Sequence, residues 1–353
     1  MVKNPTPSNR SSRVTILDVA RAAGVSKSSV SRLLDERLPR SNSEVAQRVR
    51  RIAKELGYVR DISAANLRRG STSMIGLIVP RLTDTVMAML YEALQRAAAK
   101  SGKVVIVATT DETPEAERRA ADGLIGRGVE ALVLATARND DPFIKELAER
   151  GVKYVLALRT DGASLSSIGN DELGGYLATR HLIDLNHRRI GVIAGPSFAS
   201  TACERTKGFR KAMAEAGLTV DESLIVPSTF GIESGRDAAT ELMSRSEPPT
   251  AIFAVNDNIA IGAFAAIHSL GLSVPGDVSL VGYNDIPIVS HLYTPMTSVH
   301  VPFDQIASSA LELLEAEEIQ PDERIRVAMP SLMPRQSSIS RASQKKSRDQ
   351  IAE

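Results

Sequence analysis

The sequence predicts an α/β protein in which a small helix-turn-helix headpiece precedes two doubly wound domains. At 353 residues, the chain is long enough for two or three domains. Residues 1–71 carry 15 Lys and Arg against 6 Asp and Glu, whereas the remainder carries 28 against 36. From residue 73 onward, short apolar runs alternate with helical patterns, which is typical of parallel sheets flanked by helices. A basic head on a mildly acidic body predicts a polyanionic partner for the head alone.

The head contains patterns for two short helices separated by a glycine-containing turn. Thr15 is placed to cap a first helix, which should stop at Gly24, and Ser26 is placed to cap a second one that runs to about Leu34. The first helix repeats apolar residues with helical spacing at Ile16, Val19, Ala20 and Ala23. Two short helices joined in this way predict a helix-turn-helix.

A third helix is predicted to start near Ser41, with Glu44 completing a capping box and Gly57 ending the helix. Its expected inward residues are Val45, Val49, Ile52, Ala53 and Leu56. A small helical bundle with a solvated basic face remains an alternative. The second helix favours DNA, because small hydroxyls and cations can approach phosphates and base edges without desolvating a carboxylate. Its expected outward residues are Lys27, Ser28, Ser31 and Arg32.

The body contains apolar runs that predict strands on both sides of a division near residues 167–171. The expected strands are 74–79, 104–108, 131–135, 154–157, 190–194, 250–255 and 278–281. Helical patterns at 86–100, 114–127 and 257–270 lie between them. Two doubly wound halves form a cleft at the carboxyl ends of their strands, which is the default site for a small ligand.

Polar residues that follow the predicted strands are the candidates for ligand contact. They are Asp84, Arg159, Asn256 and Asn284, and Arg205 joins them from an early position in the helix after residues 190–194. Capping of a helix is an equal alternative for Asp84, and also for Asp257. The two arginines hint at an anionic ligand, although one of them could instead pair with Asp84 or Asp285.

Other classes of protein are disfavoured by what the sequence lacks. The single cysteine, Cys203, cannot form an internal disulfide, and no Cys/His cluster has zinc-like spacing, so we expect no metal and a reducing cytoplasm. The polar N-terminus lacks the apolar core of a signal peptide, and no run approaches 18 apolar residues, so we expect no membrane partner. No phosphate loop, dinucleotide fingerprint or nucleophile elbow is found, so we expect neither a cofactor nor catalysis.

Several motifs resemble those of the LacI/GalR family of bacterial transcriptional repressors. The head carries Val14-Thr-Ile-Leu-Asp-Val-Ala-Arg-Ala-Ala-Gly-Val-Ser-Lys-Ser-Ser-Val-Ser-Arg-Leu-Leu and Glu55-Leu-Gly-Tyr. The body carries Ile75-Gly-Leu-Ile-Val-Pro, Phe253-Ala-Val-Asn-Asp and Leu280-Val-Gly-Tyr-Asn-Asp. The resemblance covers roughly residues 14–338.

The resemblance implies a mode of DNA binding. It places Lys27 and Ser28 against bases in the major groove, with Arg32 as a further contact beside Thr15 and Ser31. It also implies a hinge helix after the headpiece, whose Leu67 wedges into the minor groove. The hinge departs from the family pattern, because Arg60-Asp61 replaces the usual Pro-Asn and Ala65 replaces an arginine.

The resemblance further implies a body with the periplasmic-binding-protein type I fold and three crossings between its halves. Residues 73–168 and 298–317 are expected in the N-terminal half, and residues 169–297 and 326–338 in the C-terminal half. The headpiece is expected at 14–59 and the hinge at 60–72, with disordered ends at 1–13 and 339–353. Arg205 and Asn256 fall on positions that line the effector pocket in relatives, whereas Asn284 replaces a frequent aspartate. An aromatic residue common in the first loop of relatives is absent here.

The expected function is therefore a repressor that binds a palindromic operator as a homodimer. A small-molecule effector, a sugar or sugar derivative, would switch it from the cleft. Ile339–Glu353 has no leucine heptads of the kind that form tetramers in relatives, which favours a dimer. The alternative is a periplasmic-type binding protein without a DNA function, which would lack residues 14–70 and would need a signal peptide.

Overall fold

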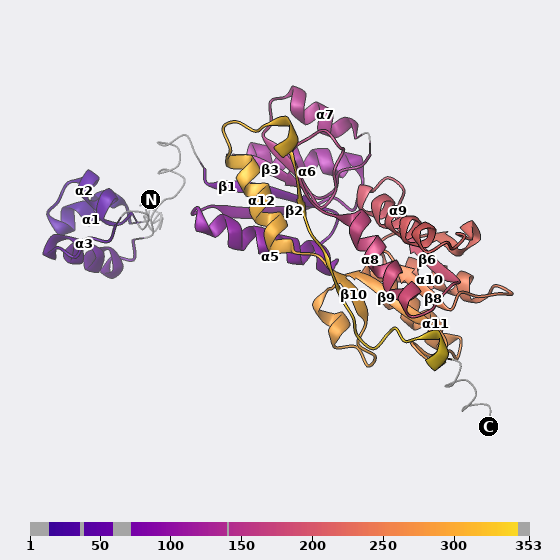
Figure 1. Ribbon diagram of the computed structural model, residues 1–353. Coiled ribbons are helices and arrows are strands. Elements are labelled where there is room, and N and C mark those ends of the chain that lie inside the picture. The colour runs from indigo at the N-terminus through magenta and orange to yellow at the C-terminus, as the bar shows by residue number, and fades with distance from the viewer. Residues whose placement is uncertain (1–13, 36–38, 59–71, 140, 345–353) are drawn as a thin grey trace, which may run out of the picture. The chain divides into compact units, whose positions relative to one another are not determined.

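A computed structural model describes residues 14–35, 39–58, 72–139 and 141–344 (Figure 1). Its contacts divide the chain after Thr72 into two compact units. Residues 59–71, which include most of the expected hinge at 60–72, the first 13 residues and the last nine lie outside the described residues, and so does the expected wedge, Leu67. The described helices are not long and apolar enough for any of them to cross a bilayer.

The first unit contains three helices, α1 (Ile16–Ala23), α2 (Lys27–Leu33) and α3 (Glu44–Glu55). They enclose a small core of apolar side chains because each helix contributes one apolar stripe. The fully or nearly fully buried members are Val19, Ala20, Ala23, Val30, Val49 and Ala53. The predicted helix-turn-helix is confirmed, with Gly24 in the left-handed conformation at the end of α1 and Ser26 capping α2.

The predicted start of the third helix is wrong. Ser43, not Ser41, caps α3, and its hydroxyl accepts from the N–H of Ala46 at 3.3 Å. The first turn of the helix also faces the core differently from the prediction, because Ala46 is buried while the predicted Val45 is exposed. Leu56 is exposed as well, because it lies at the C-terminal cap.

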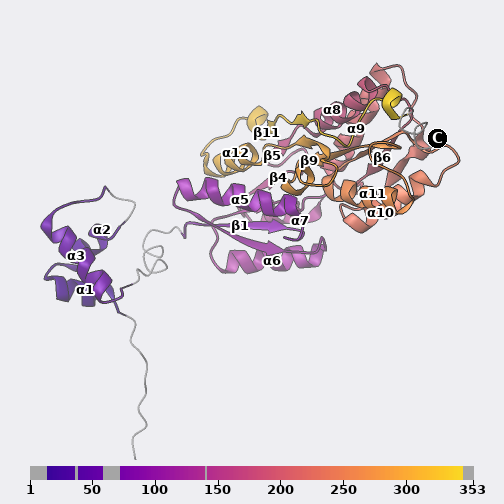
Figure 2. The ribbon, with the colours of Figure 1, turned by 90° about the horizontal axis from the view of Figure 1, so that it is seen from below.

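The second unit, which we call the body, contains two six-stranded sheets within its described residues. The first sheet has the order β11-β5-β4-β3-β1-β2, and all its strands are parallel. Its strands are β1 (Met74–Val79), β2 (Val104–Thr109), β3 (Ala131–Leu134), β4 (Tyr154–Ala157), β5 (Ser166–Gly169) and β11 (Ile325–Ala328). Helices α5 (Thr85–Lys100) and α12 (Phe303–Glu315) pack together on one face. Figure 2 shows α6 (Pro114–Gly126) on the face of β1 opposite α5, and the core on that face includes α7 (Pro142–Glu149).

The second sheet has the order β12-β10-β9-β8-β6-β7, and only the β10–β12 pair is antiparallel. Its strands are β6 (Ile190–Ala194), β7 (Ile225–Pro227), β8 (Ala251–Ala254), β9 (Ser279–Asn284), β10 (Thr297–His300) and β12 (Ser331–Met333). Its helices form two pairs, α8 (Asp171–Asp184) with α9 (Ser200–Glu215), and α10 (Ile232–Met243) with α11 (Asp257–Ser269). Short 3-10 turns lie at Glu222–Leu224 (η1), Pro287–Ser290 (η2) and Pro321–Glu323 (η3). We call the two sheets with their helices the first and second subdomains.

Two predicted crossing points between the subdomains are wrong. Residues 298–300 belong to β10 and pair with β9 of the second sheet, so the chain crosses after His300 rather than before Ser298. Residues 326–328 belong to β11 and pair with β5 of the first sheet, so the return to the second subdomain follows Ala328. Both strands are short and partly polar, so the local sequence pattern does not predict them. Their subdomain is decided by pairing with β9 and β5, which lie elsewhere in the sequence.

The predicted disorder of residues 339–353 is wrong for the part that the structure describes. The Gln344 side chain is buried, and its Nε2 donates to the carbonyl oxygens of Thr250 at 3.2 Å and Pro275 at 3.0 Å. The carbonyl oxygen of Ile339 bonds to Nε2 of His187 at 3.0 Å. These polar residues are ordered because groups of the second subdomain form hydrogen bonds with them.

The helix pairs of the second subdomain are in backbone contact. A β-carbon at Gly208 of α9 would overlap the carbonyl oxygen of Glu172 in α8, and one at Gly175 of α8 would overlap that of Arg205 in α9. Gly235 and Gly262 form the same reciprocal arrangement between α10 and α11. A side chain at any of these positions would force the two helices of a pair apart.

We therefore expect Gly208→Ala to lower the free energy of unfolding by about 3 kcal/mol, the upper end of the usual cost of overpacking. Gly126→Ala near the end of α6 is the matched control, because a β-carbon there meets nothing within 4 Å. The control should be neutral or stabilising by up to about 1 kcal/mol. Urea unfolding followed by circular dichroism measures both, and equal stabilities would contradict the backbone contact.

Candidate DNA interface and effector site

The exposed face of α2 is the candidate DNA interface. Lys27, Ser28 and Arg32 are exposed, Ser31 is half-buried, and Val30 fixes the opposite face in the core. Helix α2 contains no acidic residue. A surface of this kind can approach a phosphate backbone without repulsion.

Thr15, a further predicted DNA contact, caps α1 in this structure. The carboxylate of Asp18 accepts from its N–H at 2.9 Å and its hydroxyl at 2.7 Å. These bonds, the side-chain one first, lower the pKa of Asp18. Thr15 is exposed, so its hydroxyl lies at the surface of the headpiece.

The five predicted effector contacts converge between the two sheets of the body. The Arg159 guanidinium lies 5.4 Å from the Phe230 ring centroid, and the Phe230 carbonyl accepts from Asn256 Nδ2 at 3.2 Å. Arg205 donates to the carbonyl of Val255 at 2.7 Å. Phe230 therefore links Arg159 to Asn256, and Arg205 contacts the residue that directly precedes Asn256.

The other two predicted residues join the same region. The Arg205 guanidinium lies 3.7 Å from the ring centroid of Tyr283, which directly precedes Asn284. Asp84 accepts from Asn258 Nδ2 at 3.1 Å, and this bond links α5 of the first subdomain to α11 of the second. The site thus draws on both subdomains.

Arg159 is buried in the first subdomain and has a carboxylate partner. Its Nη2 donates to Glu112 at 2.9 Å, and its Nη1 donates to the carbonyl of Thr136 at 3.3 Å. Phe198 and Phe230 of the second subdomain lie 5.6 and 5.4 Å from its guanidinium. These two rings supply aromatic surface that the first loop lacks.

Arg205 is buried in the second subdomain, and its Nε donates to Asp171 at 2.8 Å. Burial lowers the pKa of Arg205, but the Asp171 carboxylate and Tyr283 together outweigh burial, and the net shift of the pKa is upward. The predicted alternative, pairing of an arginine with Asp84 or Asp285, is wrong, because Glu112 and Asp171 are the partners. Neither Glu112 nor Asp171 carries a motif, and their only sequence signal is a position just after a strand.

The polar side chains of the site differ in how far the fold already satisfies them. Asn256 caps α11 by accepting from the N–H of Ile259 at 2.7 Å. Asp84 caps α5 by accepting from the N–H of Val86 at 3.0 Å, and burial raises its pKa. Asn284 is 4% exposed, and its amide has no hydrogen-bond partner among the described residues. Asn284 is therefore the side chain most available to a ligand.

Asp257, a predicted helix cap, instead lies inside the second subdomain. It is fully buried and accepts from the N–H of Ile286 at 2.8 Å and from the hydroxyl of Ser298 at 2.7 Å. Burial raises its pKa from 3.8 to about 7. The described residues contain no group of His, Cys, Asp and Glu arranged to hold a metal ion.

Comparison with known proteins identifies the family. Residues 15–61 match bacterial regulatory proteins of the lacI family, and residues 179–338 match a periplasmic binding protein-like domain. The ribose operon repressor of Escherichia coli (strain K12) is 32% identical over 332 residues, which cover 92% of this chain and 99% of the relative. The chain belongs to the lacI family. The regulator DegA of Bacillus subtilis is also 32% identical, over 84% of this chain and 89% of its own length.

Solved structures of this lacI family share the fold. The complex of the transcriptional regulator CelR with cellobiose has a TM-score of 0.70 at 30% identity, covering 92% of this chain and 100% of that one. The Lac repressor dimer bound to operator and the anti-inducer ONPF has a TM-score of 0.79 at 25% identity, covering 93% and 99%. The predicted fold class is confirmed: this lacI-family protein is a DNA-binding regulator with two α/β subdomains.

The raised pKa of Asp257 predicts a pH dependence of stability. The folded state holds this proton up to about pH 7, whereas the unfolded state releases it near 3.8. Stability should therefore fall as pH rises between these values, by about 1.4 kcal/mol per unit, and level off above pH 8. Urea unfolding of the wild type and Asp257→Asn at pH 5, 6, 7 and 8 isolates the effect, because other titrating groups are common to both. A difference that does not change with pH would contradict it.

Proposed function

We propose that the protein represses transcription by binding a pseudo-palindromic operator as a homodimer, and that a small neutral effector between the subdomains switches it. The exposed face of α2 carries the first half of this proposal. Lys27 and Ser28 are the first residues of α2, from which side chains can contact base edges in the major groove. Thr15, Ser31 and Arg32 contact the DNA phosphates. A repressor of this kind acts in the bacterial cytoplasm, where its operator is.

The domain assignment that follows from this function has three parts. Residues 14–59 are the DNA-binding headpiece, residues 60–72 are a hinge with Leu67 as a minor-groove wedge, and the body from residue 73 binds the effector. A periplasmic-type binding protein is the alternative, and the lacI-family match over residues 15–61 disfavours it. The named relatives are transcriptional regulators rather than enzymes.

The effector we propose is a neutral molecule of sugar size rather than an anion. Arg159 and Arg205 each bond a carboxylate, so their charges are already compensated. Their remaining N–H groups can still donate to hydroxyls, and the unpartnered amide of Asn284 can both donate and accept. Phe198 and Phe230 offer apolar faces beside Arg159. CelR, which is similar to this chain, was solved with cellobiose.

A homodimer is supported by an exposed apolar surface on the second subdomain. Tyr293 is fully exposed and Ile288 of η2 is about half exposed, in one short segment. Large apolar side chains left in water favour burial against a partner. The Lac repressor, which is similar in structure, was solved as a dimer on its operator. A second copy of this chain is the partner we propose.

Switching requires an effector that prefers one relative orientation of the subdomains. Such a preference shifts the population of the two orientations, and the hinge transmits the shift to the headpieces. The Asp84–Asn258 bond across the subdomains belongs to the orientation in this structure. An effector that favours the other orientation has to break it.

DNA binding is tested on an operator selected from a random library. Ser28→Ala and Lys27→Ala should each relax base preference at one or two positions by about 1–3 kcal/mol, because a base contact is lost. Arg32→Ala should weaken all sequences alike. If a dimer neutralises about 8 phosphates, log K should fall with log salt at a slope near −7.

Fluorescence anisotropy measures these affinities. Lys145→Ala, on the exposed face of α7, is the control that removes a charge from the body and should change neither affinity nor preference. A slope near zero, or unchanged base preference in both α2 variants, would reject the interface.

Effector binding is tested by thermal shift with D-ribose, D-glucose, D-galactose and cellobiose against the corresponding sugar acids. Arg205→Ala should weaken effector binding by roughly ten- to a hundredfold. It should also lower stability, because it leaves the buried Asp171 carboxylate without its partner. Asn284→Ala should weaken binding about tenfold, and because its amide has no hydrogen-bond partner to lose, any loss of stability should come only from its left-handed backbone conformation. Gln320→Ala, an exposed amide before η3, is the control. Stabilisation by sugar acids alone would contradict a neutral effector.

A further inference from the structure

The loop after β9 holds two consecutive residues in an unfavourable backbone conformation. Asn284 has a φ of +102° and Asp285 a φ of +55°, a region that residues other than glycine rarely adopt. Such conformations persist where the surrounding structure enforces them, and they are frequent at ligand sites. Asn284 is also a buried residue whose side-chain amide has no hydrogen-bond partner among the described residues.

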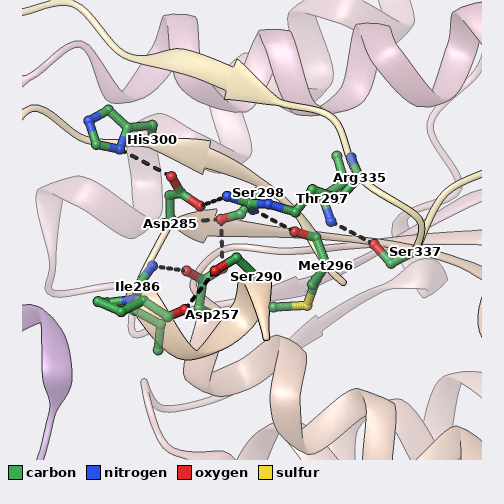
Figure 3. A network of polar contacts seen from close by, with 11 residues as sticks. Asp257, Asp285, Ile286, Ser290, Met296, Thr297, Ser298, His300, Arg335 and Ser337 are labelled. Carbon is green, nitrogen blue, oxygen red and sulfur yellow. Dashed lines mark hydrogen bonds and ion pairs between the residues drawn. The ribbon is translucent and has the colours of Figure 1, made fainter. Parts of the chain in front are cut away.

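Asp285 is bound from three directions (Figure 3). Its Oδ1 accepts from Arg335 Nη2 at 2.6 Å, and its Oδ2 lies 3.2 Å from His300 Nδ1. Its backbone N–H donates to the Ser298 hydroxyl at 3.1 Å. The carboxylate and Arg335 are both largely buried, so solvent screens their attraction only weakly.

The next residue is fixed by the same network. The Ser298 hydroxyl donates to Asp257 at 2.7 Å, and Asp257 accepts from the N–H of Ile286 at 2.8 Å. Figure 3 shows Ser298 between the two aspartates. The backbone on both sides of the Asp285 side chain is therefore tied to buried groups.

The partners of Asp285 lie on the segments that join the subdomains. Ser298 and His300 belong to β10, from which the chain passes directly to α12 of the first subdomain. Arg335 follows β12, the first strand after the chain returns from β11. Arg335 also donates to the carbonyl of Met296 at 2.8 Å, so it fastens both crossing segments to each other.

We propose that Asp285 is a positioning residue that holds the Asn284 amide in the effector site and couples it, through Arg335 and β10, to the crossing segments. This inference rests on the proposed function. When the subdomains turn relative to one another, β10 and the segment after β12 change direction, and the Asp285 contacts transmit that change to Asn284. Effector affinity then depends on subdomain orientation through this ion pair.

The test compares Arg335→Gln and Asp285→Asn with the wild-type full chain. The probe is the saccharide of the panel above that gives the largest thermal shift, and the readout is operator affinity with and without it. Both variants should bind operator normally in its absence. Effector affinity should fall about tenfold, and the ratio of operator affinities with and without the saccharide should approach 1.

Arg180→Gln is the matched control, because it removes an exposed ion pair with Asp184 in the same subdomain. It should leave affinity and coupling unchanged. If Arg335→Gln and Asp285→Asn lose stability alone, with wild-type affinity and coupling, the pair is only structural and the inference is wrong. If Asn284→Ala itself leaves saccharide binding intact, the proposed effector site is wrong instead.

Hydrogen exchange provides a measurement that needs no saccharide. In Arg335→Gln, the amides of Asp285 and Ile286 should exchange at least about tenfold faster than in the wild type, since Arg335 no longer holds the Asp285 side chain and the loop can open more often. Arg180→Gln should leave them unchanged. Equal exchange in Arg335→Gln and wild type would overturn the inference even if no saccharide of the panel binds.

Discussion

The buried ion pair between Arg205 and Asp171 organises the second subdomain. Two charges removed from water are tolerated only when they are paired and their remaining hydrogen-bonding groups are satisfied. Asp171 is the first residue of α8, Arg205 lies in α9, and Arg205 also binds the end of β8 and stacks on Tyr283 of β9. One guanidinium therefore fixes the elements that present Asn256 and Asn284. Because Asp171 compensates its positive charge, the pair adds hydrogen-bond donors to the site but no net charge.

The same principle applies in the first subdomain, where Glu112 compensates Arg159. Each subdomain thus brings its own neutralised arginine to the common site. Because both pairs form within a subdomain, the subdomains can move apart without stranding a charge. The contacts that have to break include the bond from Asn258 to Asp84 and the stacking of Phe198 and Phe230 on Arg159.

The sequence was sufficient for elements that a local pattern determines. The apolar runs at 74–79, 154–157 and 190–194 became strands with those bounds, because a buried parallel strand is apolar on both faces. It was insufficient for β10 and β11, which are short, partly polar and paired with strands far away in the chain. The sequence allowed the site residues to be proposed from their place after strands or on family positions, but their charge partners, Glu112 and Asp171, follow from tertiary packing that no local pattern records.

The reciprocal glycine contacts of α8 with α9 and of α10 with α11 have a consequence for how such a protein can change over evolutionary time. Helices whose backbones touch accept almost no new side chain at the contact, so this framework tolerates few substitutions there. The ligand-facing residues, in contrast, lie in loops after strands, where exchange of one polar side chain leaves the helix pairs intact. Recognition of a new small molecule is therefore accessible through single substitutions, while the scaffold that reports its binding stays constant.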